Sequence, residues 1–569
     1  MINNEIAERL MNIADIMEFK QIQWKPRAYR AAARKIEDLK QNISDIYKEK
    51  GKKGLQDIPK IGKSLADHIA EYIENGSVRK WEKLEKESPK GAHELSKIEN
   101  LGPKKVKKLM EIGVHGIEDL KKAIKNKKIR NIEGFGKRTE KELLTGIKQY
   151  EKGTERMLLD KAMRIAERII NNIKKNSDIK TIDYAGSLRR MKETVGDIDL
   201  LCITKNAKKA MDTFVSMDDV GRVISHGKTK STVQLKEGIN VDLRALSRAS
   251  YGSAMLYFTG SKDHNIELRK IALNKGYKLS EYGLYRKKSN RKSAGKTENE
   301  VYTKLGLSFI PPELRENNNE IEIAEKGGIP RLVEARDIKA DLQMHTKYSD
   351  GDASVKEMAE KAKKLGYKYI AITDHSKSQR IAHGMNKRQI KRQWKEIDKL
   401  GISGMEVLKG AEVDILASGK LDYPAPLLRE LDIVLAAVHS RFKSPEKEMT
   451  KRITKALENK YVDIFAHPTG RIIHKRPGYK VNLDKLFKAA EENNNILEIN
   501  ADPARLDLSG EMLLKAKGYN IKFSIGTDSH SIQGLENMKY GVAQARRGWL
   551  RRKNVVNTKT YQQLRKLIK

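Results

Sequence analysis

The first 150 or so residues carry apolar side chains at three- and four-residue spacing, with many lysines between them. This periodicity predicts helices that each bury one face, and short glycine-containing turns separate them. We therefore expect an all-α N-terminal region.

A mixed pattern follows from about residue 155 to 315. Helical stretches alternate there with short β-rich runs at 197–203, 232–235 and 240–245. Such a mixture predicts an α+β unit. The segment 317–336, after two prolines, looks like a connector.

From Asp341 onward, apolar runs recur about every thirty residues, with helical stretches between them. Five of these runs end in polar residues that can carry chemistry, namely Asp374-His375, Glu412, His439, His467 and Asp528-Ser529-His530. Parallel strands joined by helices place their C-terminal ends on one face. The order therefore predicts a βα barrel whose site lies on that face.

One motif recurs three times within the N-terminal helices, at 58–63, 98–103 and 132–137, and a basic helix follows each copy. The copies resemble helix-hairpin-helix modules, in which a helix N-terminus offers free N–H groups and a positive dipole to a phosphate. Such contacts bind DNA without reading its sequence. Only the third copy has both glycines, and Lys60 tolerates the positive φ expected at the first glycine's place poorly. The candidate DNA-binding residues are Gly62, Gly102, Lys104, Gly134, Gly136 and Lys137.

The length of 569 residues predicts three or four domains, and 115 Lys and Arg against 76 Asp and Glu give a net charge of +39. A basic chain points to nucleic acid, although a general lysine bias on solvated helices would give the same charge. Cys202 is the single cysteine, which excludes internal disulfides and Cys-based zinc sites. Without a signal-like N-terminus or a stretch of 18 apolar residues, we expect a cytoplasmic, nucleoid-associated protein with no membrane partner.

Three aspartates follow a glycine–serine turn in the α+β unit. Asp197 and Asp199 share one β-rich run, so their side chains point one way and Ile198 points into the core. Asp242, on a neighbouring strand, would complete a cage for hard divalent cations. Two such cations can activate a 3'-hydroxyl and stabilise departing pyrophosphate. The cage predicts nucleotidyl transfer with Mg²⁺ or Mn²⁺.

An Asp-x-Asp pair alone is common on exposed strands, so its surroundings decide the interpretation. Gly186 lets the backbone approach closely, Ser187 supplies a hydroxyl, and Arg190 can fork onto phosphate oxygens. A triphosphate could therefore be held beside the carboxylates.

With these motifs, residues 1 to about 315 resemble the X-family DNA polymerases, the group that includes polymerase beta. The resemblance implies that Asp197, Asp199 and Asp242 hold two metal ions, with Asp242 nearest the primer terminus. It also implies that a triphosphate contacts Ser187, Arg190 and Gly196.

The segment Tyr257-Phe258-Thr259-Gly260-Ser261 matches the family's signature beside the incoming nucleotide. The resemblance implies that the Tyr257 ring and a strand backbone crowd a ribose 2'-hydroxyl, whereas the pair by itself could be a buried aromatic pair before a turn. It also implies that Asn265 touches the minor-groove edge of the new base pair. Lys262 replaces an acidic residue of polymerase beta, and we expect it to tighten nucleotide binding before template pairing.

One family activity is not expected here. Removal of a 5'-deoxyribose phosphate by Schiff-base chemistry needs an amine. His68 stands where polymerase beta carries its nucleophilic lysine, and Lys63 lies close in sequence.

Seven of the twelve histidines lie beyond residue 340. A single His at a strand end is usually an ordinary hydrogen-bonded residue, but several in phase with carboxylates predict a metal centre. Mixed imidazole and carboxylate ligands suit manganese, zinc or iron rather than calcium. The candidate ligands are His345, Asp350, His375, Glu412, His439, His467, Asp528 and His530.

Four motifs of this region, at 341–351, 373–375, 466–468 and 527–530, together resemble the polymerase and histidinol phosphatase (PHP) domain. The resemblance implies a distorted seven-stranded barrel, up to three metal ions and phosphoester hydrolysis. Gln343 replaces the first His of the family's usual pair. A neutral amide is a poor ligand, so we expect that metal position to be weaker.

These regions together predict a template-directed, gap-filling repair polymerase. We expect it to use dNTPs and gapped or nicked duplex DNA, and to need no second chain. The barrel would act on 3' ends as an exonuclease or 3'-phosphatase, or at abasic sites as an endonuclease. Two alternatives remain open, a DNA-tethered phosphoesterase with little polymerase activity and a non-catalytic DNA-end scaffold. The expected domains are two helix-hairpin-helix domains (1–90 and 91–150), a nucleotidyltransferase palm (151–250), a nucleotide-selecting, thumb-like subdomain (251–316), a linker (317–336) and the PHP barrel (337–569).

Overall fold

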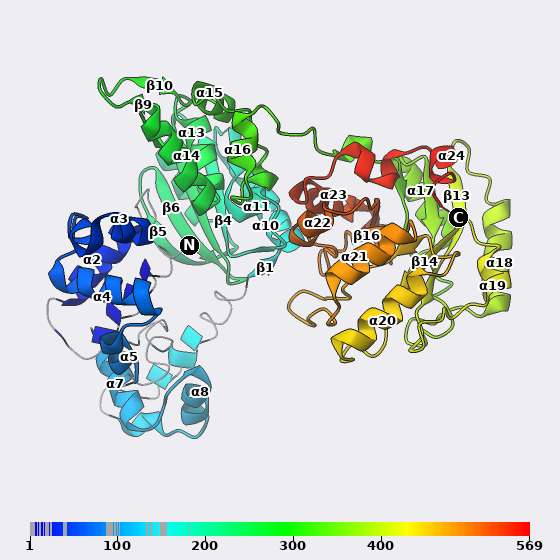
Figure 1. The fold of residues 1–569 in the computed structure, drawn as a ribbon, viewed down its shortest axis with the longest axis horizontal. Coiled ribbons are helices and arrows are strands. Elements are labelled where there is room, and N and C mark those ends of the chain that lie inside the picture. Colours follow the sequence, from blue (N-terminus) through cyan, green and yellow to red (C-terminus); the bar gives the residue numbers. More distant parts are fainter. Residues whose placement is uncertain are drawn as a thin grey trace.

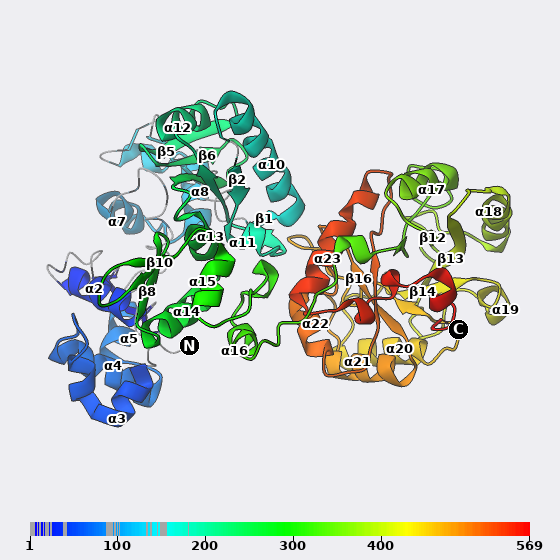
Figure 2. The same cartoon turned by 90° about the horizontal axis from the view of Figure 1, so that it is seen from above.

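The computed structural model describes residues 156–568 except 180, and most of 6–147, with its longer gaps at 18–21, 38–42, 87–94 and 148–155. Figure 1 shows helices at the N-terminal end, a mixed core, and a C-terminal barrel. The core lies between the other two parts in this view and in the perpendicular one (Figure 2).

Two helical groups, each with its own apolar cluster, make up the described N-terminal part. The first cluster includes Ile36 and Trp81, and the second includes Leu109 and Leu120. Two separate clusters mean that two helical units pack independently, and the expected all-α region is confirmed. The helices are α2 (Lys25–Glu37), α3 (Ile43–Gln56), α4 (Lys63–Asn75), α5 (Arg79–Lys86), α7 (Pro103–Glu111), α8 (Ile117–Lys125) and the short η1 (Ile129–Asn131).

A five-stranded sheet in the order β2-β4-β7-β6-β5 forms the centre of the core. β4 and β7 run parallel, and the other neighbours are antiparallel. The sequence predicted β4, β6 and β7, but it missed β2 and the edge strand β5, whose residues are mostly exposed and lack apolar alternation. The strands are β2 (Thr181–Tyr184), β4 (Asp197–Ile203), β5 (Val220–His226), β6 (Lys230–Leu235) and β7 (Asn240–Leu246), and β1 (Met157–Leu158) pairs with β3 (Thr194–Val195).

Helix α10 (Leu159–Asn176) covers one face of this sheet. Its buried residues recur at three- and four-residue spacing, and they join the apolar side chains of β4 and β7 in one cluster. The short helix α11 (Gly186–Arg189) follows β2, and α12 (Ala207–Val215) follows β4. This packing holds β4 and β7 rigidly side by side.

A smaller subdomain follows β7, with a three-stranded antiparallel sheet in the order β10-β9-β8. The segment 317–336, expected to be a plain connector, contains a helix, α16, whose Ile321 and Ala324 pack into this subdomain's apolar cluster. The elements are α13 (Tyr251–Thr259), α14 (Lys262–Asn274), β8 (Tyr277–Ser280), β9 (Gly283–Arg286), β10 (Lys292–Ala294), α15 (Glu298–Lys304), η2 (Pro312–Leu314), α16 (Glu320–Glu325) and η3 (Ala335–Asp337).

Seven parallel strands, β11 to β17 in sequence order, form the C-terminal barrel. A bridge between Met344 and Ser529 joins the first strand's end to the last, so the barrel is nearly closed, as predicted. The strands are β11 (Ala340–Asp341), β12 (Tyr369–Ile372), β13 (Glu406–Asp414), β14 (Ile433–Ala437), β15 (Ile464–Phe465), β16 (Ile496–Asn500) and β17 (Phe523–Gly526).

Helices cover the outside of the barrel, and side chains alternate between its interior and this outer layer. Tyr369 and Ala371 belong to the interior cluster, whereas Ile370 and Ile372 pack against the helices. The helices are α17 (Val355–Lys364), α18 (Lys387–Lys399), α19 (Ala425–Leu428), α20 (Glu446–Leu457), α21 (Leu483–Glu492), α22 (Gly510–Ala516), α23 (Met538–Arg547) and α24 (Tyr561–Leu564), with the short η4 (Gly534–Asn537), η5 (Arg552–Asn554) and η6 (Val556–Thr558).

The barrel packs directly against the core. Leu506 and Tyr540 of the barrel are buried in the same apolar cluster as α10 and the core sheet. Arg471 forks onto Glu193, with its two nitrogens 3.0 and 2.8 Å from the carboxylate oxygens. Apolar contact and a bidentate ion pair thus fix the two parts together. Among the described residues, no helix combines the length and apolar character needed to cross a membrane.

Candidate active sites

The three aspartates of the core lie on two adjacent parallel strands. Asp199 of β4 is the register partner of Asp242 of β7, so both side chains leave the sheet on the same side. Asp197 is exposed, Ile198 is fully buried and Asp199 is half-buried, which is the alternation expected from the sequence. The sheet therefore brings the three carboxylates together.

Asp242 is held by its neighbours across the sheet. The Thr232 hydroxyl donates to Asp242 Oδ1 at 2.6 Å. Lys230 Nζ and Arg244 Nη2 each lie 3.4 Å from Asp242 Oδ2. Three donors from β6 and β7 fix the orientation of this carboxylate.

Burial raises the pKa of Asp199 to about 7, and the negative charges of Asp197 and Asp242 act in the same direction. Carboxylates placed so closely repel one another unless a cation lies between them. Oxygen-only donors of this kind suit hard divalent ions. The residues present therefore fit the divalent metals that the sequence predicted.

Gly186, at the start of α11, has a φ of +63°, and a β-carbon there would lie 2.6 Å from Asp199 Oδ2. A side chain at this position would displace the carboxylate, so glycine is required both by its φ and by the space. Gly196 is packed more loosely, because a β-carbon there would lie 3.0 Å from Arg156 Nη1.

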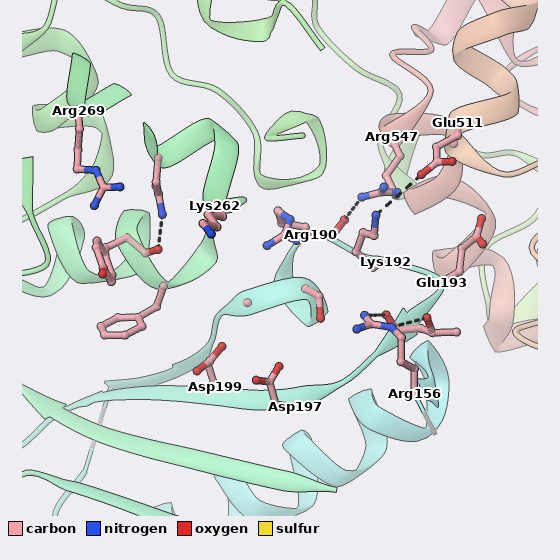
Figure 3. Close-up of a pocket in the computed structure, with 18 residues that line it drawn as sticks. Arg156, Arg190, Lys192, Glu193, Asp197, Asp199, Lys262, Arg269, Glu511 and Arg547 are labelled. Carbon is pink, nitrogen blue, oxygen red and sulfur yellow. Dashed lines mark hydrogen bonds and ion pairs between the residues drawn. The ribbon is translucent and has the colours of Figure 1, made fainter. Parts of the chain in front are cut away.

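A cavity of about 820 Å³ opens in front of Asp197 and Asp199 (Figure 3). Six cationic side chains line it against four carboxylates, which suits a polyanionic ligand. The residues lining it that the sequence had singled out are Gly186, Ser187, Arg190, Asp197, Asp199, Tyr257, Phe258, Gly260, Lys262 and Asn265.

Gly196 and Asp242 are not among the lining residues. Sequence reasoning missed the lining residues Arg156, Lys192, Glu193, Thr194, Arg269, Gly510, Glu511 and Arg547. They lie in no motif, and the last three come from the barrel, so no local pattern could have found them.

The segment 257–261 ends a helix and continues into a turn. Tyr257 lies in the last turn of helix α13, and Gly260 ends that helix. The helix forms because residues 252–256 are small or apolar and are buried between β4 and α15. The Tyr257 and Phe258 rings meet edge to face at 5.1 Å, and Asn265 Nδ2 donates to the Tyr257 carbonyl at 2.6 Å.

The barrel gathers the predicted ligands at the C-terminal ends of its strands. Glu412 lies at their centre. The sequence predicted that its strand ends at Glu412, and strand β13 continues to Asp414. Its Oε1 lies 2.8 Å from His467 Nε2 and 3.2 Å from His439 Nε2. Its Oε2 lies 3.2 Å from His375 Nδ1 and 3.4 Å from His345 Nε2.

Three overlapping groups of these side chains have ligand atoms within 4.8 Å of one another. Together with His467 on Glu412, they bring all eight predicted ligands together. The groups are His345, Asp350, His375 and His530; His375, Glu412 and His439; and His345, Glu412 and Asp528.

The donor set fits bound metal ions. His345 and His467 are buried, and among the described residues neither ring's Nδ1 has a hydrogen-bond partner. His439 Nδ1 lies 2.6 Å from Asp414 Oδ1, the carboxylate–imidazole pairing that orients a metal-binding histidine. Burial would lower the pKa of His439, but Glu412 and Asp414 raise it to about 10, which marks a strongly anionic site.

Gln343 does not join these groups. In the amide orientation that satisfies both its oxygen and its nitrogen, the Gln343 nitrogen donates to Glu498 Oε2 at 2.8 Å. Burial raises the pKa of Glu498 well above its ordinary value, and the charge of Asp528 adds to this. Sequence reasoning missed Glu498 because it missed β16, although the alternation from Ile496 to Asn500 is a strand pattern.

The hairpins are described only in part. Gly62 is the N-cap residue of α4, is exposed, and has open space around its α-carbon, and Gly136 is likewise exposed and open. Lys60 does adopt a φ of +76°, despite the penalty for a side chain there. Lys104 lies in the first turn of α7, whereas Gly102, Gly134 and Lys137 lie outside the described residues.

His68 does not resemble a reactive group. It is buried, and its Nδ1 lies 3.1 Å from the Tyr29 hydroxyl. Burial lowers its pKa, and the charge of Lys80 adds to this. The ring is a packed core residue, and Lys63 is exposed at the start of α4.

Models of protein families match four segments of the chain. They are a helix-hairpin-helix domain (residues 1–78), a SAM-like helix-hairpin-helix tandem (92–149), the DNA polymerase beta thumb (254–316) and the PHP domain (341–502).

Curated relatives match the whole chain or about a third of it. The DNA polymerase/3'-5' exonuclease PolX of Bacillus subtilis is 39% identical over 575 residues, which cover 100% of both chains. A probable phosphatase of Thermoanaerobacter is 34% identical over 203 residues, or 33% of this chain and 78% of the relative. A probable phosphatase of Acetivibrio thermocellus is 32% identical over 204 residues, with the same coverage.

Proposed function

The chain belongs to the X-family DNA polymerases that carry a PHP-domain 3'-5' exonuclease, and we propose that it fills short gaps during DNA repair. The enzyme joins a nucleotidyltransferase to a metal-dependent phosphoesterase. One geometric observation carries the gap-filling proposal. Asp197 and Asp199 line a cationic cavity large enough for a nucleotide, and Asp242 is the register partner of Asp199 on the adjacent strand.

The proposal assigns the domains as follows. Residues 1–90 and 91–150 bind the DNA backbone through their hairpins, 151–250 form the palm, and 251–316 select the nucleotide. The segment 317–336 leads to the barrel at 337–569. The described glycines Gly62 and Gly136 support backbone contacts, because both are exposed and open to a phosphate.

In the palm, Asp197, Asp199 and Asp242 would hold two Mg²⁺ or Mn²⁺ ions. Bound there, the ions would supply charge neutralisation for the triphosphate and a lower pKa for the primer hydroxyl. Ser187, Arg190 and Gly196 would bind the triphosphate of a dNTP.

The other residues at the cavity would select the nucleotide. Tyr257 would pack against the sugar, and Phe258 and Gly260 would line its site. Asn265, which already donates to the Tyr257 carbonyl, would hold that turn while facing the new base pair. Lys262, exposed at the cavity, would add charge beside the triphosphate.

In the barrel, the eight grouped ligands would hold up to three ions of manganese, zinc or iron. Metal ions bound there would supply hydroxide at neutral pH. The chain's own residues orient the site, since Asp414 fixes His439, and Asp374 accepts hydrogen bonds from the backbone and hydroxyl of Thr346 at 2.8 and 2.7 Å. The substrate would be a 3'-terminal phosphodiester of DNA.

A one-nucleotide gapped duplex tests the proposal directly. Purified protein with Mg²⁺ or Mn²⁺ should add one templated dNMP, and it should shorten an unpaired 3' end without dNTPs. Absence of incorporation under both metals would refute gap filling and leave the phosphoesterase alone. That alternative is not favoured, because the three carboxylates and the cavity are intact. Light scattering on the DNA complex tests whether one chain suffices.

A further inference from the structure

The barrel supplies one wall of the cavity in front of the palm aspartates. Gly510, Glu511 and Arg547, from α22 and α23, line this cavity together with Ser187 and Arg190 of the palm. Figure 3 shows Arg547 and Glu511 reaching from the barrel toward Arg190 and Lys192. A nucleotide in the cavity would therefore meet residues of both domains.

Arg547 holds the palm at the turn that carries the phosphate-binding residues. Its Nη1 donates to the Arg190 carbonyl at 2.8 Å, at the C-terminal end of α11. One turn earlier on α23, Gln544 Nε2 donates to the Met191 carbonyl at 3.2 Å. Two successive carbonyls that follow Ser187 are thus fixed by one helix of the barrel.

Arg547 also shares a carboxylate with Arg190. Both guanidinium groups reach Glu316 Oε1 at 3.0 Å, from Arg190 Nε and Arg547 Nη1. Burial would raise the pKa of Glu316, but the charges of Arg190, Arg547 and Lys192 outweigh it and hold that pKa below its ordinary value. Glu316 is therefore an anion shared by the buried Arg547 and the half-buried Arg190.

Arg190 is oriented by these contacts. Its Nε donates to Glu316, and its Nη1 donates to the Thr259 carbonyl, next to Gly260 of the nucleotide signature. A guanidinium has five N–H groups, so a side chain fixed by two of them can still present others to a phosphate. Without Arg547, Glu316 would have one cation fewer and would compete more strongly with a phosphate for Arg190.

From these contacts we infer that Arg547 of the barrel is a positioning residue for nucleotide binding in the palm, acting through Glu316 and the carbonyl of Arg190. The inference rests on the proposed gap-filling function. Its consequence is that the polymerase site is complete only when the barrel is docked. Arg547 ends a helix that runs back from the face bearing Asp528 and His530, so it acts on the palm and not on the barrel's own chemistry.

The test compares Arg547→Met, Arg547→Lys and Arg546→Met in the full chain. Arg546 is the matched control, because it is the next residue on α23 and pairs with Glu313 at 2.7 Å, yet it does not line the cavity. KM for the dNTP and kcat are measured on a one-nucleotide gap, and exonuclease activity is measured on an unpaired 3' end. The melting temperature of each variant reports folding.

Arg547→Met should raise KM for the dNTP about ten- to hundredfold, the usual range for a lost hydrogen bond to a charged group, with a much smaller change in kcat. Arg547→Lys keeps the positive charge but lacks the planar guanidinium, so its KM for the dNTP should lie between that of Arg547→Met and that of wild type. Exonuclease activity should be retained by all three variants. Arg546→Met should keep the wild-type KM.

Two outcomes overturn the inference. The first is an unchanged KM in folded Arg547→Met. The second is an equal rise in KM in Arg546→Met, since the interface would then act through stability alone. If Arg547→Met does not fold, the same comparison made with Arg547→Lys decides the question. Failure of the wild-type chain to incorporate any nucleotide would instead refute the proposed function, so the two failures are distinguishable.

Discussion

Gly186 approaches Asp199 so closely that a β-carbon at position 186 would lie 2.6 Å from the Asp199 Oδ2 atom. The relationship joins the turn that carries Ser187 to the strand that carries the carboxylates. It also explains a residue choice, because the position combines a φ of +63° with no room for a methyl group.

Gly186→Ala should therefore lower nucleotide incorporation about a hundredfold, since displacement of a reacting group by about 1 Å has effects of this size. Gly327→Ala is the matched control. Its φ is +68° with nothing within 4 Å, so it carries only the cost of a left-handed alanine, about 1–2 kcal/mol. Single-turnover incorporation on a gapped duplex measures both. Equal activity of the two variants would contradict this explanation.

Lys262→Ala should weaken binding of a dNTP to the protein in the absence of DNA. The ammonium lines the cavity beside Asn265 and Arg190, where it adds positive charge next to a triphosphate. We expect the dissociation constant to rise about tenfold, measured by titration calorimetry with Mg²⁺. Lys270→Ala is the control, because Lys270 lies on the same helix and pairs with Glu267 at 2.6 Å but does not line the cavity. An unchanged dissociation constant for Lys262→Ala would reject the role given to Lys262.

The two active sites should separate by mutation. Asp242→Asn removes one of the palm's carboxylates and should reduce incorporation by at least about a hundredfold while exonuclease activity persists. His439→Ala combined with His467→Ala should do the reverse, because both rings contact Glu412 in the barrel. Asp178→Asn, a largely exposed carboxylate, should change neither activity. Joint loss of both activities in either variant would mean that the sites depend on shared structure.

Replacement of Gln343 should change how much metal the barrel binds. In the present chain its amide is paired with Glu498 instead of joining the ligand groups. Gln343→His would put an imidazole beside that carboxylate, and elemental analysis after loading with Mn²⁺ should then find more metal per chain than in wild type. The His467→Ala variant should contain less metal per chain than wild type. The same metal content in Gln343→His and wild type would mean that position 343 does not limit the site.

Stability of the thumb-like subdomain should depend on pH through His264. The ring is fully buried, between Glu320 at 2.7 Å and the Tyr302 hydroxyl at 2.9 Å. Burial lowers its pKa in the folded state, although Glu320 opposes this. Below pH 6.5, about the ordinary pKa of histidine, His264 binds a proton in the unfolded chain but not in the folded chain. The stabilisation is therefore complete above that pH and is lost as the pH falls.

The melting temperature of wild type should accordingly fall between about pH 7 and 5 more steeply than that of His264→Gln, which has no titrating ring. His115→Gln replaces an exposed ring and should keep the wild-type slope. Parallel pH profiles for wild type and His264→Gln would contradict the assignment of this dependence to His264.

Local pattern was enough to find the elements that carry most of the chemistry. β4 and β7 were predicted because their buried and exposed positions alternate, and the barrel was predicted because apolar runs ended repeatedly in ligand-type residues. β5 escaped because an exposed edge strand needs no apolar alternation. The helix α13 that contains Tyr257 was also not predicted, since its small and apolar residues suit a buried helix and a buried strand equally well.

The sequence by itself determined the two chemistries, because carboxylate spacing on a strand and ligands at strand ends are local consequences of backbone geometry. Only the tertiary structure decided how the two parts meet. Arg547 contacts the Arg190 carbonyl across 357 positions of the chain, and Gln343 pairs with Glu498 of β16 next to Gly526 of β17. Such contacts depend on the docking of complete domains and strands, and no local pattern of polar and apolar residues encodes them.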